Sequence, residues 1–174
     1  MSKFRIIIFT ILISLLLISC TPSENDISFE LNPGNDTIEL GSNYQDPGVT
    51  ARVFGIKRKT EVIENNVNVN QVGTYYIVYH FSYNDIEMEL TRIVTVVDQT
   101  PPAIELNPGV DTIKLGESWT DAGILYFDNS QAEITVEVIG DVDTSTVGEY
   151  EIIYIATDIY GNSSEISRII TVVE

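Results

Sequence analysis

The side chains of this chain with the clearest chemical potential are its carboxylates, which number 26 among 174 residues. Carboxylate and amide oxygens are the ligands that Ca²⁺ prefers, about six to eight of them per ion. One continuous EF-hand loop does not fit, because the run that begins at Asp141 has Thr146 at position six and Ile152 at position twelve, where such a loop needs Gly and Glu. Two interpretations stay open: a calcium site built from separate segments, or acids that cap turns and solubilise the surface. The candidate ligands are Asp98, Asp121, Asp128 and Asp158, with Asn129 and Asn162 beside them.

Residues for nucleophilic catalysis are scarce, since the chain has one histidine, His80, and one cysteine, Cys20. His80 stands between Tyr79 and Phe81 in a strand-like segment, where a lone histidine is more often structural than catalytic. A single cysteine excludes an intramolecular disulfide and a metal site of several cysteines. No glycine-rich phosphate loop occurs. We therefore predict that the protein is not an enzyme.

The charge of the chain is strongly acidic, with 26 acids against 9 bases. Without residues 1–19, which contain two bases and no acid, the net charge falls from −17 to −19. Such a surface repels phosphate backbones, so we predict no nucleic-acid partner. Three of the few bases are consecutive, Lys57, Arg58 and Lys59. They favour either a contact with an acidic partner or a solvated hairpin tip.

The first twenty residues, MSKFRIIIFTILISLLLISC, combine a basic start with a short apolar run. The run, residues 6–18, covers roughly 20 Å as a helix and falls short of a hydrocarbon core of about 30 Å. Such a segment is typical of an export signal. The final LISC resembles the lipobox of bacterial lipoproteins. The resemblance implies that Cys20 is lipidated and anchors the exported protein at the bacterial cell membrane or outer surface.

A repeat organises the rest of the chain, because LNPGNDTIELG at 31–41 returns as LNPGVDTIKLG at 106–116. The same shift of 75 residues places Tyr44 on Trp119. VGTY and VGEY follow at matching positions, and RIVTVV and RIITVV close the two copies with one residue inserted. The chain therefore carries two copies of one module.

The repeat sets the predicted domain boundaries. Residues 1–19 form the signal peptide, and 20–27 form the lipidated cysteine with a polar, flexible tether. The modules are 28–97 and 103–174. The linker, 98–102, ends in two prolines that fix φ and remove two donors, so we expect it to be short and semi-rigid.

Inside each module, apolar residues recur with the period of two that is typical of half-buried strands. In EYEIIYIA, Glu151 should face water, while Tyr150, Ile152 and Tyr154 should face the core. Asn-Pro-Gly, Tyr-Gly-Asn and Val-Gly provide turns, and no segment has a convincing helical period. We predict an all-β fold of small antiparallel sandwiches. Truncating Trp119, Tyr150 or Tyr154 should then cost roughly 3–5 kcal/mol if each ring is buried.

These segments resemble the bacterial surface-protein Ig-like domain family, long described as a domain of unknown function. The second copy fits nearly throughout, whereas the first has FSYNDIEMEL at 81–90 where the second has an Ala-Thr-Asp…Gly-Asn segment. The resemblance implies two tandem Ig-like antiparallel β-sandwich modules of seven strands each. It also implies that Gly-x-Tyr forms a tyrosine corner, whose hydroxyl bonds back to the backbone. It does not imply a shared ligand.

Three non-catalytic functions stay open after this resemblance. We predict a surface protein that binds or adheres to a protein or glycan; the alternatives are a structural spacer or stalk, and a carbohydrate-binding accessory module. The last requires exposed aromatic rings, for which Tyr83 and Tyr126 are candidates because each is expected in a loop. The alternation of the other tyrosines favours core packing over a sugar platform. A contiguous exposed apolar patch favours a binder, and an evenly acidic surface favours a spacer.

Overall fold

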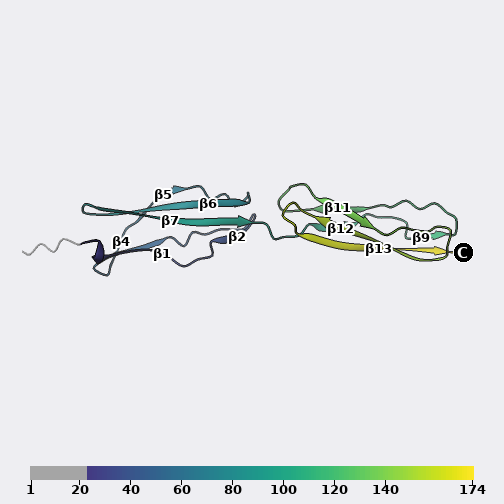
Figure 1. Ribbon diagram of the computed structural model, residues 1–174, viewed down its shortest axis with the longest axis horizontal. Helices are drawn as coiled ribbons and strands as arrows, with labels where there is room; N and C mark the ends of the chain where they lie inside the picture. Colours follow the sequence, from purple (N-terminus) through teal and green to yellow (C-terminus); the bar gives the residue numbers. More distant parts are fainter. Residues whose placement is uncertain (1–22) are drawn as a thin grey trace, which may run out of the picture.

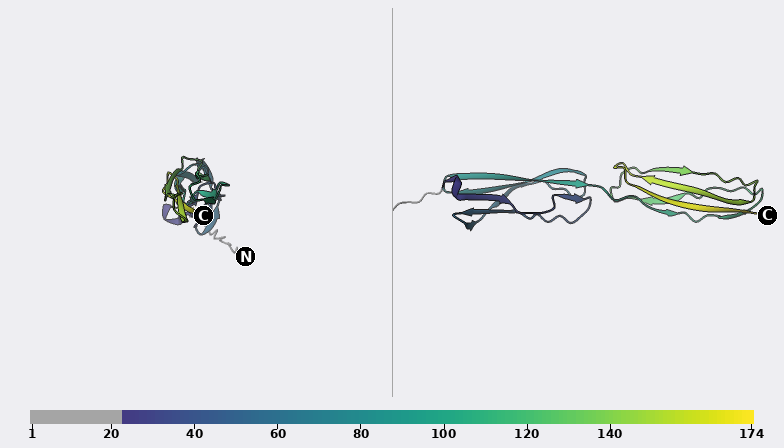
Figure 2. Two further views of the ribbon diagram at one scale, coloured as in Figure 1. Left: turned by 90° about the vertical axis from the view of Figure 1, so that its right-hand side faces the viewer. Right: turned by 60° about the horizontal axis from the view of Figure 1, so that its bottom comes forward.

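The computed structural model describes residues 23–174, so the predicted signal segment and Cys20 lie outside the described residues. Two modules lie end to end and give the described chain an elongated shape (Figures 1 and 2), with the C-terminus at the far end from the start of module 1. A single 3-10 turn, Glu24–Asp26, precedes module 1. Between residues 23 and 174, no helix has the length and hydropathy needed to cross a membrane.

Module 1 contains two facing sheets, one of three strands in the order β1-β3-β4 and one of four in the order β2-β7-β6-β5. Its strands are β1 (Ile27–Leu31), β2 (Thr37–Glu39), β3 (Val49–Val53), β4 (Ile56–Arg58), β5 (Glu61–Asn65), β6 (Gly73–Tyr83) and β7 (Ile86–Val97).

Module 2 repeats this plan with one strand fewer, in sheets ordered β10-β8 and β11-β12-β13-β9. Its strands are β8 (Ala103–Leu106), β9 (Thr112–Lys114), β10 (Ile124–Phe127), β11 (Thr135–Ile139), β12 (Gly148–Thr157) and β13 (Ser163–Val173). The missing strand is the counterpart of β4. The predicted all-β tandem architecture is confirmed, and the expected seven strands occur in module 1 only.

The modules are not purely antiparallel, because β2 pairs with β7, and β9 with β13, in parallel. The cause is local. The chain that leaves β1 crosses to the other sheet at the Asn-Pro-Gly turn and continues in the same direction as β7. Two residues after each of these short strands, the chain turns at a glycine in the left-handed region, Gly41 with φ 75° and Gly116 with φ 80°. The remaining strand pairs are antiparallel as predicted.

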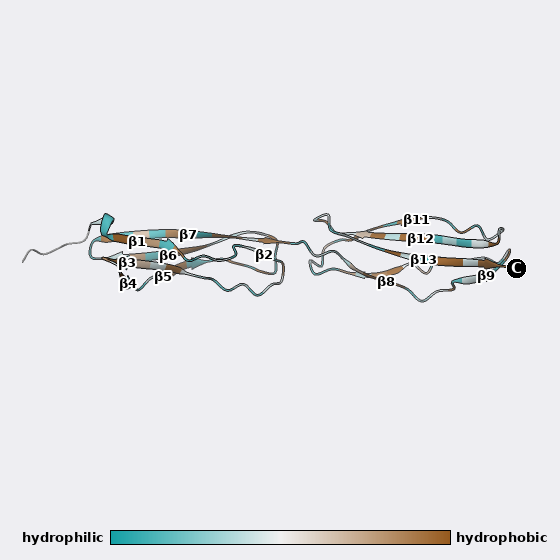
Figure 3. Cartoon of the chain, turned by 90° about the horizontal axis from the view of Figure 1, so that it is seen from below, coloured by the Kyte–Doolittle hydropathy of each residue, from teal (hydrophilic) through white to brown (hydrophobic). Residues whose placement is uncertain are grey.

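The period of two decides which side chains form the cores. In β12, Ile152 and Tyr154 are buried and Glu151 is exposed, as predicted. In module 1, the rings of Phe29 and Phe81 meet across the sheets with centroids 5.7 Å apart. Trp119 and Tyr150 are only half-buried, so their truncation should cost less than that of Tyr154. Figure 3 shows the hydrophobic segments on the strands and hydrophilic residues in the first turn.

Both modules contain the predicted tyrosine corner. The hydroxyl of Tyr75 donates to the carbonyl of Gln71 at 2.8 Å, and that of Tyr150 to the carbonyl of Thr146 at 2.9 Å. The bond spans four residues each time and fixes the chain where it enters β6 or β12.

Candidate functional site

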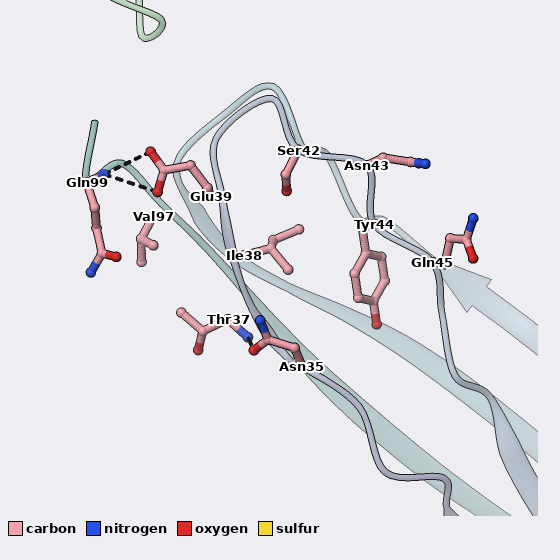
Figure 4. A pocket seen from close by; sticks show the side chains of 10 residues that line it. All are labelled: Asn35, Thr37, Ile38, Glu39, Ser42, Asn43, Tyr44, Gln45, Val97 and Gln99. Atoms are coloured by element: carbon pink, nitrogen blue, oxygen red, sulfur yellow. Dashed lines mark hydrogen bonds between the residues drawn. The ribbon is translucent and has the colours of Figure 1, made fainter. Parts of the chain in front are cut away.

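The linker between the modules is fixed in place, because residues of both modules contact it. Glu39, on β2, accepts hydrogen bonds from the backbone N–H of Gln99 at 3.0 and 3.2 Å and from the Thr100 hydroxyl at 2.7 Å. Figure 4 shows this carboxylate at one end of a groove of about 500 Å³ that Tyr44 also lines. On the other side of the joint, Pro102 is fully buried. The linker therefore has a defined conformation.

Three aspartates meet where this linker reaches module 2. Asp98 begins the linker, Asp128 follows β10, and Asp158 follows β12. One oxygen from each lies within 4.8 Å of the others. The three residues are only 7%, 4% and 6% exposed, respectively. We call this group the joint carboxylates.

The hydrogen bonds of the joint carboxylates leave two oxygens without a partner. Asp158 is satisfied, because Tyr160 and Asn162 donate backbone N–H groups at 2.8 Å and the Asn162 side chain donates at 2.7 Å. Asp98 Oδ1 accepts one backbone N–H, from Thr100 at 3.2 Å, and Asp128 Oδ1 accepts from Ser130. The Oδ2 atoms of Asp98 and Asp128 are buried without any hydrogen-bond partner.

The negative charges of the joint carboxylates are not paired with a basic side chain in the part of the chain that the structure describes. Burial raises the pKa of Asp98, and the charges of Asp128, Asp158 and Glu39 raise it further. Burial also opposes ionisation of Asp158, but hydrogen bonds from Asn162 and from neighbouring N–H groups outweigh it and lower the pKa of that residue. Among residues 23–174, every ion pair involves other acids. Arrangements of buried like charges without a cation are unfavourable.

The joint carboxylates have no acidic counterparts in the first repeat. With the shift of 75, Asp98, Asp128 and Asp158 fall on Ser23, Val53 and Tyr83. The corresponding end of module 1 instead has the β3–β4 turn and the tight β6–β7 hairpin. Hard oxygen ligands are thus concentrated at the end of module 2 that receives the linker.

Asp121, the fourth candidate ligand, lies apart from the joint in a network that the sequence analysis missed. Its carboxylate accepts the hydrogen bond of the buried Tyr154 hydroxyl. In the same network, Arg168 donates to Asp111 at 2.6 Å and to the carbonyl of Asn107. Module 1 repeats the arrangement with Arg92, Asp36, Asp46 and Tyr79. The signal was available, because the two aspartates and the tyrosine recur at the shift of 75 and the arginine recurs once the one inserted residue is allowed for.

These buried arginines have a structural role, since each one bridges the two sheets of its module. Arg92 is 1% exposed and donates to both Asp36 oxygens, at 2.7 and 2.9 Å, and to two backbone carbonyls. Burial raises the pKa of Tyr79 to about 12, and its hydrogen bond to Asp46 adds to the rise. Burial and Asp121 likewise raise the pKa of Tyr154 to about 12. The network therefore needs neutral tyrosines.

The strand that module 2 lacks leaves β10 with an open edge. In module 1, β3 pairs with β1 and β4, whereas β10 pairs with β8 alone. Leu125 and Phe127, on one face of β10, are 62% and 67% exposed, and Tyr126 is 46% exposed. Unpaired backbone groups beside exposed apolar side chains are the features that a partner strand uses.

The other candidate contact residues lie in different places. Tyr83 and Tyr126 are in strands β6 and β10, not in the expected loops. Strand β6 continues up to the short turn at Tyr83, and β10 extends to Phe127. Arg58 covers the Tyr83 ring at 5.1 Å. Lys59 pairs with Glu61 at 3.2 Å, with both side chains well exposed.

Lys57, Arg58 and Lys59 are at the end of module 1 opposite the joint. The adjoining turn places the N–H of Phe54 2.9 Å from the carbonyl of Asp26, close to the start of the described chain. His80 lies next to this region, in a shallow hollow with Lys59, Glu61 and Ser82.

The fold and its repeat define a class of protein, a tandem array of small Ig-like sandwiches. The family model described as "Bacterial surface protein, Ig-like domain" matches residues 29–96 and again 107–172. These two matches cover more than half of the chain, so the chain belongs to this family. The predicted family and its two tandem copies are confirmed, and the assignment fits a protein of the bacterial cell surface.

Two further proteins are similar to this chain. The pesticidal crystal protein Cry22Aa of Bacillus thuringiensis is 26% identical over 148 residues, which is 78% of this chain and 20% of that protein. The chain thus spans about a fifth of that relative's length. The crystal structure of the lipoprotein BT2262 from Bacteroides thetaiotaomicron aligns with 83% of this chain and 100% of its own, at 17% identity and a TM-score of 0.35.

Proposed function

We propose that the chain is an exported, lipid-anchored surface protein whose tandem Ig-like modules bind a partner without catalysis. The observation that supports binding over a pure spacer is the open, apolar edge of β10. A spacer needs no exposed Leu125 and Phe127, whereas a partner strand can pair with this edge and cover both side chains. A protein is therefore the partner that we favour.

A carbohydrate platform has less support. Tyr126 and Phe127 are neighbours in a strand, so their rings point to opposite faces and do not form one flat surface. Tyr83 is already covered by the Arg58 guanidinium. The spacer function keeps support from the end-to-end modules and the held linker (Figure 1).

Capture from surface extracts by an immobilised fragment, Thr21 to Glu174, distinguishes these functions. We expect specific capture of a protein, and loss of it in the double variant Leu125→Glu with Phe127→Glu. The matched control is Val62→Glu with Ile63→Glu on β5, because these residues are 54% and 53% exposed. Exposed substitutions should leave both variants folded. Capture of nothing would support a spacer instead, and equal capture by both variants would place the binding surface elsewhere than the edge of β10.

A further inference from the structure

The joint carboxylates form a cage with unused ligand atoms. Oxygens bound to one calcium ion at about 2.4 Å can be at most about 4.8 Å apart. One oxygen from each of Asp98, Asp128 and Asp158 meets this limit. The Oδ2 atoms of Asp98 and Asp128 are also buried without a hydrogen-bond partner, which is rare for buried carboxylate oxygens. The close approach of the oxygens and the two unsatisfied acceptors both favour a cation at this position.

We propose that Asp98, Asp128 and Asp158 bind one calcium ion, which locks the linker onto module 2. Three carboxylates that are less than a tenth exposed bring about three negative charges together. Within residues 23–174, the ion pairs of lysine and arginine involve none of the three. An all-oxygen set suits a hard cation, and loops of this kind suit calcium better than the strict octahedron of magnesium.

The origin of the three ligands determines what the ion does. Asp98 belongs to the linker that Glu39 of module 1 binds, whereas Asp128 and Asp158 belong to two loops of module 2. One ion therefore joins three segments that are far apart in the chain. Because module 1 is attached to the same linker, calcium should fix the angle between the modules. This inference is independent of the partner proposed for β10.

Titration of calcium chloride into the chelator-treated fragment from Thr21 to Glu174 tests the proposal. Calorimetry should give one site per chain, with magnesium chloride binding at least about tenfold more weakly. Trp119 is the only tryptophan, so its fluorescence follows the melting of module 2 alone. The melting temperature of module 2 should rise by about 4 °C or more at saturating calcium. No heat and no rise would overturn the proposal, and equal binding of magnesium would overturn the choice of calcium.

The variant Asp128→Asn separates a cation site from acids that only cap turns. Asparagine retains the acceptor for the Ser130 N–H but removes one buried charge. In chelator, the variant should melt above the wild type, because like-charge repulsion is relieved. In calcium, it should bind more than about tenfold more weakly and gain little. Glu149→Gln, an equal charge change at an exposed site on β12, should behave like the wild type.

Other calcium affinities or melting temperatures of these variants would contradict the proposal. Equal calcium affinity in Asp128→Asn and Glu149→Gln would mean diffuse binding to an acidic surface. A chelated Asp128→Asn protein that melts well below the wild type would mean that the charged aspartate stabilises the loop without an ion. Small-angle scattering should also show a narrower range of shapes when calcium is added to the wild type, and no change in Asp128→Asn.

Discussion

The side-chain amide of Asn162 donates to the backbone oxygen of Asp98, 3.2 Å away and 64 positions earlier in the chain. The same amide nitrogen lies 2.7 Å from Asp158 Oδ2. A residue of the β12–β13 turn thus binds the linker and one joint carboxylate together. The contacts of the linker therefore contribute to the stability of module 2.

The substitution Asn162→Ala should therefore destabilise module 2 by about 1–2 kcal/mol, because two hydrogen bonds to buried or half-buried acceptors are lost. Chemical unfolding in chelator, followed by Trp119 fluorescence, measures this change. Asn129→Ala removes an exposed amide from the neighbouring loop and should change stability by less than about 0.5 kcal/mol. Equal midpoints for the two variants would show that the amide contributes nothing.

The substitution Arg168→Met should cost about 3 kcal/mol of module 2 stability. Arg168 is 3% exposed and donates to Asp111 and to the Asn107 carbonyl, so its replacement removes the contact that joins the two sheets and leaves the half-buried carbonyl without this donor. Lys114→Met, at an exposed position of the same module, is the control and should stay within about 0.5 kcal/mol of the wild type. A loss as small as that of the control would contradict a structural role for this arginine.

Much of the fold could be predicted from the sequence because its signals are local and repeated. The alternation in EYEIIYIA is sufficient to bury Ile152 and Tyr154, and Val-Gly-x-Tyr is sufficient to form the corner. The parallel pairing of β2 with β7 was missed, because the alternation of a three-residue strand does not specify its partner.

The candidate site was less accessible to sequence reasoning, because its parts meet only through loop geometry. Asp98, Asp128 and Asp121 were equally plausible ligands from composition, and only the course of the chain separates Asp121 from the joint. The open edge of β10 was hidden for a related reason. The chain after Phe127 forms a turn at Asp128, whereas the matching segment of module 1 forms β4.

Alkaline pH should weaken both modules through Tyr79 and Tyr154. Their pKa values are about 12 in the folded protein, chiefly because burial disfavours the phenolate, against about 10 in an unfolded chain. The folded state thus binds more protons between pH 10 and 12. Stability is fully present below pH 10 and falls across this window, by roughly 3 kcal/mol per module.

Unfolding of the fragment at several pH values between 9 and 12, followed by Trp119 fluorescence, measures the effect for module 2. The variant Tyr154→Phe should have a much flatter profile above pH 10, because it removes the group that titrates. Tyr126→Phe, at an exposed position of β10, should retain the decline. If Tyr154→Phe loses stability as steeply as Tyr126→Phe, another group causes the alkaline transition.

The corner hydroxyl makes a smaller contribution. Tyr150→Phe should cost about 1 kcal/mol, because it removes one hydrogen bond to the Thr146 carbonyl and retains the half-buried ring. The equivalent variant Tyr75→Phe should cost module 1 a similar amount through the Gln71 carbonyl. Calorimetric melting of each variant checks this, and unchanged melting temperatures in both would show that the corner bond has no net value.

The membrane anchor predicted from LISC is tested by Cys20→Ala in the full chain. A thioether lipid requires the cysteine sulfur, so the variant should be released from membranes or remain unprocessed, whereas wild-type protein fractionates with them. Labelling with a radioactive fatty acid should mark the wild type and not the variant. Ser23→Ala, three residues further on, should leave both results unchanged. Membrane fractionation and labelling that survive Cys20→Ala would assign the anchor to another part of the chain.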